Sequence, residues 1–393
     1  MSTPSLLNIP YVIKAGTLYS QIPETGAGDF VVTRSASNAA TRINSLGFIE
    51  TVSDNIPRLD YPLGGAVNGC PALLVEPAAT NLARWVNQMT AQDTPAASGG
   101  MTVTTGSTDF LAPDGTSGSI TKYVGGAASG TSQYAYYTGG QVTASASGVH
   151  TFSLFVKRGA TNPLNFCALG IGNYDGGSGT TYSYFNLASG TALTAGASVQ
   201  DYGNGWYRLT TAPYTLAAGD LNGTLLFFMA EGNGDRSWPA SGALNLTAYT
   251  WGAQMEAGSV ATSYIPTTTT SITRNADVLT DTSYTLPTPS GSIYSEFIAS
   301  RTASYYVHSV GPVPITTGSN RIAITYTDSN ISVYKNGAFV VSQSIGTYPI
   351  GGNIINLGHS SGSFQLNDNL LSFAIYDSTL SAADAISLTS GSI

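Results

Sequence analysis

Residues 321–345 read RIAITYTDSNISVYKNGAFVVSQSI and carry the clearest fold signal in the chain. On either side of Asn336 and Gly337, β-branched and aromatic side chains alternate with polar ones. An Asn-Gly pair between alternating segments favours a type I′ turn, because both central residues must adopt positive φ angles. The stretch therefore predicts three strands, the last two joined by a tight hairpin at Asn336–Gly337.

Further strand signals flank this hairpin. SIYSEFIA at 292–299 and NLLSFAIYDS at 369–378 alternate apolar and polar residues, as a half-buried strand does. SAADAISL at 381–388 predicts a short helix, with Ser381 as its N-cap and Asp384 in its first turn. We therefore predict a β-sandwich over residues 291–393.

Residues 91–270 contain a second set of strand and turn signals. The strongest strand candidates are TFSLFVK at 151–157, GWYRLT at 205–210, LLFFMA at 225–230 and LTAYTWGAQME at 246–256. Glycine-rich turns separate them, which is typical of a two-sheet jelly-roll sandwich. Residues 1–90 are irregular and predict an extended N-terminal arm, and residues 271–290 predict a linker. The predicted fold class is all-β, with two β-sandwich domains after the arm.

The composition excludes several kinds of partner. Charged residues make up 9% of the 393 residues, and the net charge is −8. A negative chain is a poor nonspecific binder of nucleic acid, because binding to phosphates needs Lys and Arg. The N-terminus lacks the basic start and apolar run of a signal peptide, and LLFFMA is far too short to span a bilayer. We expect neither a nucleic-acid partner nor a membrane partner.

Residue types that carry catalysis or bind metals are sparse. The three histidines, His150, His308 and His359, do not have the spacing of zinc ligands. GHSSG at 358–362 matches a nucleophile-elbow pattern, but that elbow needs a following helix and β-like sequence follows here. The two cysteines, Cys70 and Cys167, are interpreted as buried free thiols. We predict no catalytic residue, no metal site, no cofactor and no enzymatic activity.

The segment CPALLVEPAATNL at 70–82 places a glutamate among apolar residues. Cys70 has no nearby His or second Cys to activate it, so a reactive thiol is not indicated. A short buried strand through Leu73 and Val75 fits better, with Glu76 at its end. We predict that Glu76 meets backbone N–H groups or an arginine, Arg58 and Arg84 being nearest in sequence, and that the segment joins the arm to the first sandwich.

Loop aromatics beside polar residues are the candidates for sugar binding, because rings stack on apolar sugar faces while charged groups bind hydroxyls. One loop, GNGDRSWPASG at 232–242, holds Asp235, Arg236 and Trp238, and another, GNYDGGSGTTY at 172–182, holds Tyr174 and Asp175. The same residue types also suit packing between subunits. A third candidate group is Tyr134, Tyr136 and Tyr137.

Several stretches together resemble a known family. An ordered series over residues 6–82, made of LLNIPYVIKAGTLYSQIP, GDFVVTRSASNAATRINSLGFIE, PRLDYPLGG and CPALLVEPAATNL, resembles the start of bacteriophage head-fibre (head-spike) and related tail-fibre proteins. FLAPDGTSGS at 110–119 and WGAQMEAGSVATSYIPT from residue 251 extend the likeness, and residues 91–270 are similar to carbohydrate-binding-module jelly rolls. Residues 291–388 resemble a laminin-G or concanavalin-type sandwich.

The resemblance implies a fibre or spike on the surface of a tailed bacteriophage particle, with a head fibre preferred over a tail fibre. It would be made in the host cytoplasm, form a homo-oligomer, most simply a homotrimer, and attach to capsid or tail proteins through residues 1–90. The two sandwiches would then be displayed outward and adhere to glycans. The alternatives are a tailspike depolymerase that acts on surface polysaccharide and a secreted bacterial glycan-binding lectin.

Overall fold

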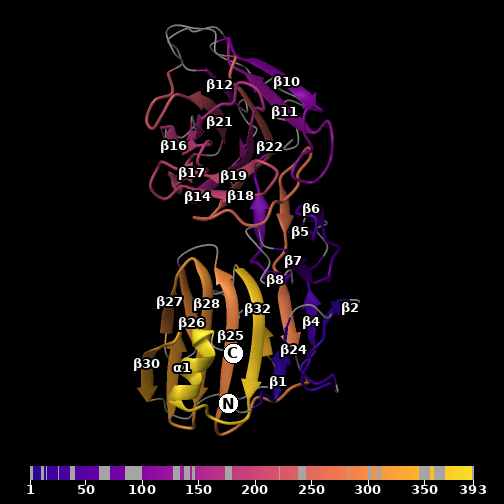
Figure 1. Ribbon diagram of the computed structural model, residues 1–393, viewed down its shortest axis with the longest axis vertical. Helices are drawn as coiled ribbons and strands as arrows, with labels where there is room; N and C mark the ends of the chain where they lie inside the picture. Colours follow the sequence, from indigo (N-terminus) through magenta and orange to yellow (C-terminus); the bar gives the residue numbers. More distant parts are fainter. Residues whose placement is uncertain are drawn as a thin grey trace.

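The computed structural model shows two β-sandwiches stacked end to end (Figure 1). It describes residues 3–9, 13–14, 16–24, 26–35, 40–61, 71–84, 100–126, 133–136, 142–143, 147–172, 179–220, 222–237, 245–281, 283–299, 303–307, 311–344, 355–357 and 368–391. Strands dominate these residues, and the predicted all-β sandwich fold is confirmed.

The first sandwich, formed by residues 100–257, packs two antiparallel sheets face to face. Its seven-stranded sheet contains β10 (Thr102–Ser107), β11 (Ile120–Val124), β14 (Gly148–Arg158), β18 (Ser198–Asp201), β19 (Trp206–Thr210), β20 (Tyr214–Leu216) and β22 (Thr247–Ala257). Its six-stranded sheet contains β12 (Gln133–Tyr136), β13 (Val142–Thr143), β15 (Phe166–Gly172), β16 (Thr181–Asn186), β17 (Thr191–Ala192) and β21 (Asn222–Ala230). The inward residues, such as Phe152, Leu154 and Phe227, form one large apolar core. Cys167 belongs to this core, and burial raises the pKa of its thiol, as expected of an inert cysteine.

The second sandwich is built around an eight-stranded sheet. This sheet contains β1 (Leu6–Asn8), β7 (Arg58–Asp60), β8 (Ala72–Val75), β25 (Gly291–Ala299), β28 (Gly318–Tyr326), β29 (Asn330–Lys335), β30 (Ala338–Ser344) and β32 (Asp368–Tyr376). The five-stranded sheet contains β2 (Ile13–Lys14), β3 (Thr17–Leu18), β4 (Phe30–Thr33), β24 (Val278–Asp281) and β31 (Ile355–Leu357). Both sheets and the hairpin of β26 (Ala303–Val307) and β27 (Gly311–Ile315) contribute to one core.

The locally encoded features of the second sandwich are confirmed. Asn336 and Gly337 adopt φ angles of 47° and 80° and connect β29 to β30, as a type I′ turn requires. Helix α1 (Ala382–Ser390) begins after Ser381, whose hydroxyl accepts a hydrogen bond from the Asp384 N–H. The helix packs on the outer face of the eight-stranded sheet through an apolar cluster that includes Leu388 (Figure 1).

The described residues among the first 84 differ from the predicted extended arm, because they are folded into both sandwiches. β1 and β8 extend the eight-stranded sheet by pairing with β32, and β7 pairs with β8 at the edge of the sheet. The hairpin of β5 (Thr41–Ile43) and β6 (Ile49–Thr51) packs instead into the core of the first sandwich. The pairings of β1 and β8 with β32 join residues 369 positions apart (Leu6 with Ile375) and 293 positions apart (Val75 with Asp368), so the local sequence pattern contains no trace of them.

The predicted linker is also part of the fold. β23 (Ile272–Arg274) pairs with β9 (Ala79–Asn81), and β24 pairs with both β4 and β31. Leu73 and Val75 are buried as predicted, at 1% and 0% exposure, but in the core of the second sandwich and not the first. The N-terminal segment and the 261–281 segment together form the joint between the sandwiches.

Candidate functional site

An aromatic surface lies on the outer side of the six-stranded sheet. Along β16 and β21 successive side chains alternate between the two sides of the sheet, so Phe185 and Phe227 enter the core while Tyr182 and Phe228 face outward. We call the outward group the tyrosine face; it consists of Tyr134, Tyr182, Tyr184, Phe228 and Arg236. Four neighbouring segments thus supply its side chains.

Arg236 lies over these rings. Its guanidinium carbon lies 3.7 Å from the ring centroid of Tyr182 and 5.2 Å from that of Phe228. Phe228 also contacts Tyr134 and Tyr182, with centroid separations of 4.7 and 5.4 Å. The first pair is tilted by 33° and the second is edge-to-face at 81°. Aromatic rings beside guanidinium donors combine an apolar surface with hydrogen-bond donors, the two kinds of group that sugar-binding sites use.

The predicted sugar-binding residues have different outcomes. Arg236 joins the tyrosine face, whereas the exposed Asp235 accepts a hydrogen bond of 2.8 Å from the Ser237 N–H and closes a turn. Trp238, Tyr174 and Asp175 lie outside the described residues. Sequence reasoning missed Tyr182 and Phe228, although the alternation in TYSYFN at 181–186 places Tyr182 and Tyr184 on one side of a strand.

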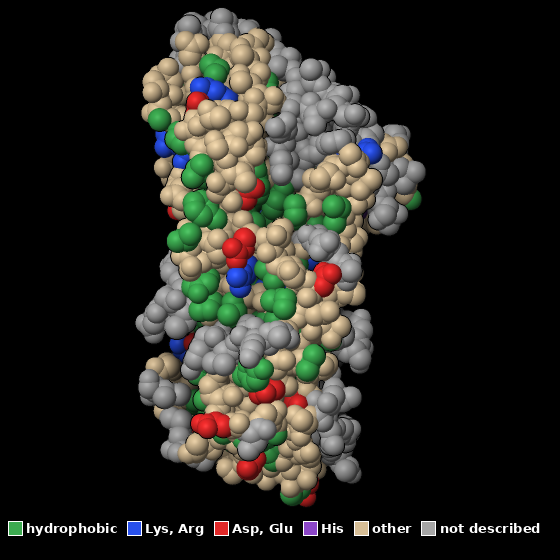
Figure 2. Space-filling model, turned by 90° about the vertical axis from the view of Figure 1, so that its right-hand side faces the viewer, with side chains coloured by type: hydrophobic (Ala, Val, Ile, Leu, Met, Phe, Trp, Pro, Cys, Tyr) green, Lys and Arg blue, Asp and Glu red, His purple; other side chains and the backbone are tan. Residues whose placement is uncertain are grey.

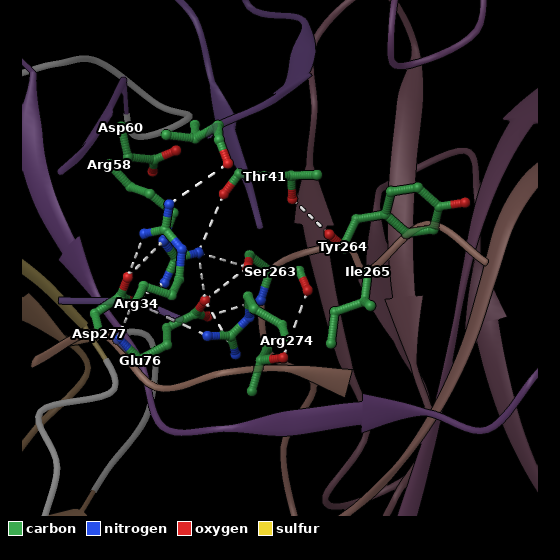
Figure 3. Close-up of polar contacts among 12 residues, drawn as sticks. Arg34, Thr41, Arg58, Asp60, Glu76, Ser263, Tyr264, Ile265, Arg274 and Asp277 are labelled. Atoms are coloured by element: carbon green, nitrogen blue, oxygen red, sulfur yellow. Dashed lines mark hydrogen bonds and ion pairs between the residues drawn. The ribbon is translucent and has the colours of Figure 1, made fainter. Parts of the chain in front are cut away.

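A second candidate site, made of charged and polar side chains, lies buried at the joint between the sandwiches (Figure 3). Arg58 donates from Nη1 to Glu76 Oε2 at 2.8 Å and contacts both carboxylate oxygens of Asp277. It also donates to the Thr41 carbonyl oxygen at 3.1 Å and to Ser263 Oγ at 2.8 Å. The predicted pairing of Glu76 with an arginine is confirmed, with Arg58 as the partner.

Further residues complete this cluster. Arg34 donates to Asp277 Oδ1 at 2.7 Å, and the Ser263 N–H donates to Glu76 Oε1 at 2.7 Å. The guanidinium of Arg274 lies 3.4 Å from Glu76, but none of its nitrogen atoms has a hydrogen-bond partner among the described residues. We call Arg34, Arg58, Glu76, Arg274 and Asp277 the joint cluster.

The pKa values of two buried carboxyl groups at the joint are shifted in opposite directions. Burial raises the pKa of the Glu76 carboxyl, but the charges of Arg274 and Arg58 and the bonds from Ser263 outweigh it and hold that pKa well below its usual range. Asp60 lies beside the cluster. There burial outweighs the hydrogen bond from the Ile43 N–H and the charge of Arg58, and it raises the pKa of the Asp60 carboxyl to about 6. The cluster saturates its carboxylates with internal partners, so it fits a structural role and not a catalytic one.

Other candidates from the sequence contribute no site. Glu256 is buried and accepts hydrogen bonds from Gln254 Nε2 at 2.6 Å and from the Thr262 N–H at 2.9 Å, as a structural carboxylate does. Cys70, His308 and the GHSSG segment with His359 lie outside the described residues. Within the described ranges, no three His, Cys, Asp or Glu side chains converge as a metal site requires. No helix among the described residues is long and apolar enough to cross a membrane.

The sequence matches no protein-family model and no curated protein.

Proposed function

We propose that this protein is a structural and adhesive fibre or spike on the surface of a tailed bacteriophage particle, with a head fibre preferred, and that it binds glycans through the first sandwich. The proposal assigns no enzymatic step to the chain. The ordered sequence series at 6–82 supports the class of protein, and the construction of the joint supports the mechanical role.

The joint between the sandwiches is the observation that carries the proposal. The chain crosses between the cores four times, from β4 to β5, β6 to β7, β8 to β9 and β23 to β24. A single flexible linker would allow the two domains to move independently. Four crossings around a buried ion cluster instead give a stiff rod, which suits a protein that must hold a binding domain away from a particle.

The position of the chain ends gives the rod a polarity. Residues 6–8 and helix α1 both belong to the second sandwich, so the first sandwich lies at the opposite end of the molecule (Figure 1). In this proposal the second-sandwich end attaches to capsid or tail proteins, and the first sandwich with its tyrosine face points outward. On the face seen in Figure 2, acidic side chains predominate over the lower sandwich, so a basic surface on the particle would complement it.

We expect the purified chain to assemble as a homotrimer. Fibres on virus particles gain stiffness and multivalent adhesion from identical chains, since linked binding sites raise avidity without new contacts. Light scattering coupled to gel filtration should give three times the monomer mass, and antibody labelling should place the chain on intact particles. A stable monomer that is absent from purified particles would rule out the fibre proposal.

Tyr182→Ala should weaken glycan binding by about fivefold, because one aromatic contact contributes on the order of 1 kcal/mol. The measurement is retention of host surface polysaccharide by the immobilised protein, with Tyr207→Ala as a control on the opposite sheet. Release of reducing sugar, followed in the same samples, would reveal the depolymerase alternative. Equal retention by both variants would remove the tyrosine face from the proposal.

A further inference from the structure

A cavity of about 270 Å³ opens beside the seven-stranded sheet of the first sandwich, away from the tyrosine face. Its wall combines the 110–113 loop, the turn at 204–206 and the tip of the β5–β6 hairpin. Pockets for drug-sized ligands usually measure about 300 to 1,000 Å³, so this cavity suits one small ring. The residues that matter for its chemistry are Phe48, Phe110, Pro113, Lys157, Asn204 and Trp206.

The cavity wall is fixed before any ligand arrives. The Trp206 Nε1–H donates to the Leu111 carbonyl oxygen at 2.9 Å, and the Ile49 N–H donates to the Pro113 carbonyl oxygen at 2.9 Å. Phe110 packs edge-to-face on Tyr249, with ring centroids 5.0 Å apart. Such bonds hold the aromatic wall in place, and a ligand then binds without a large ordering cost.

Lys157 is the charged group of this cavity. Its ammonium lies 4.4 Å from the Phe110 ring centroid and donates to the Asn204 carbonyl oxygen. No carboxylate among the described residues lies within ion-pair distance of Lys157, whereas nearby Lys122 pairs with Asp109 at 2.7 Å. Partial burial lowers the pKa of the Lys157 ammonium, as expected of a cation that lacks a counter-ion.

We propose that this cavity binds a single acidic sugar residue, with the sugar carboxylate on Lys157 and the apolar side of the ring against Phe110. Phe48 and Pro113 flank the ring, and Asn204 lies beside the ammonium. The carboxylate supplies the counter-ion that Lys157 lacks, and a charge-assisted bond in a partly buried site is among the stronger polar contacts. The inference names a class of sugar for the proposed glycan adhesion. It rests on the proposed function only in taking the sugar to be part of a glycan that the protein binds.

Titration calorimetry with glucuronic acid tests the cavity on the unmodified protein. We expect glucuronic acid to bind, and its methyl ester, which keeps the ring but loses the charge, to bind about ten- to a hundredfold more weakly. Lys157→Gln should cause a loss of the same size, while Lys122→Gln should bind glucuronic acid normally. Unfolding temperatures of the two variants show whether each is folded.

Three results would overturn the proposal: no binding of glucuronic acid by the unmodified protein, equal binding of acid and ester, or full binding by a folded Lys157→Gln. The ester comparison decides the matter even where Lys157→Gln fails to fold, since it needs no substitution. If Tyr182→Ala lost polysaccharide retention but still bound glucuronic acid normally, the tyrosine face and the cavity would be shown to bind independently. Failure of the cavity therefore leaves the tyrosine face and the fibre proposal to be judged separately.

Discussion

Arg58→Met should lower the free energy of unfolding by about 3 to 5 kcal/mol, the largest loss we expect from a single substitution outside the apolar cores. Arg58 is fully buried and bridges Glu76, which follows β8, and Asp277, which precedes β24. Methionine fills much of the space but leaves two buried carboxylates with fewer partners. Urea unfolding followed by tryptophan fluorescence measures the change.

Two matched substitutions distinguish how much the hydrogen bonds of Arg58 and its charge each contribute to the free energy of unfolding. Arg274→Met removes an equally buried guanidinium that makes no hydrogen bond among the described residues, and it should stay within about 1 kcal/mol of the unsubstituted protein. Arg42→Met removes a partly exposed pair with Glu50 at 2.7 Å, and it should cost less than about 1 kcal/mol. If Arg58→Met behaved like Arg42→Met, the joint cluster would not be what holds the sandwiches together.

The sequence predicts those parts of the fold whose signals are local. The turn at Asn336–Gly337 depends on two adjacent residues that accept positive φ, and the start of α1 depends on Ser381 and Asp384. The early strands have no such signal. β8 contains only four residues, and its partner β32 lies almost 300 positions later, so ALLV does not reveal which sandwich it joins.

The candidate sites also contain some contacts that the local sequence predicts and others that depend on residues far apart in the chain. The pairing of Glu76 with an arginine could be predicted, because a buried carboxylate needs a cation or N–H donors. Asp277 could not, because its segment has no apolar periodicity and its role depends on a contact with Arg34 across 243 positions. The loop sequence predicts Arg236 as a candidate, but its ring partner Tyr182 comes from another strand. The tyrosine face therefore appears only when β16 and the 231–237 turn are placed side by side.

Asp60 should give the protein a pH dependence opposite to that of Glu76. Its folded-state pKa of about 6 lies above the ordinary value of 3.8, so the folded state holds a proton that the unfolded chain releases. The stabilising contribution of this proton is complete below pH 3.8 and is lost as the pH rises through about 6. For Glu76, whose pKa is depressed, the contribution is present above its ordinary pKa and is lost in acid.

Asp60→Asn should therefore stabilise the protein by about 2 to 3 kcal/mol at pH 8 and change little at pH 4. Asparagine keeps an acceptor for the Ile43 N–H, which donates to Asp60 Oδ1 at 2.6 Å. Its new N–H₂ group faces Asn369, whose Oδ1 lacks a hydrogen-bond partner among the described residues and can turn to accept it.

Urea unfolding of the Asp60→Asn variant and the unsubstituted chain between pH 4 and pH 8 measures the difference directly. The gap between the two curves should open mainly between about pH 4 and pH 6. Glu76→Gln, in contrast, should be destabilising at pH 7 and progressively less so in acid. A constant gap across this range would show that Asp60 does not titrate there. Asp60 and Glu76 both lie at the joint, and their contributions to the free energy of unfolding change with pH in opposite directions. The sum of the two contributions should make the junction between the sandwiches most stable in mildly acidic solution.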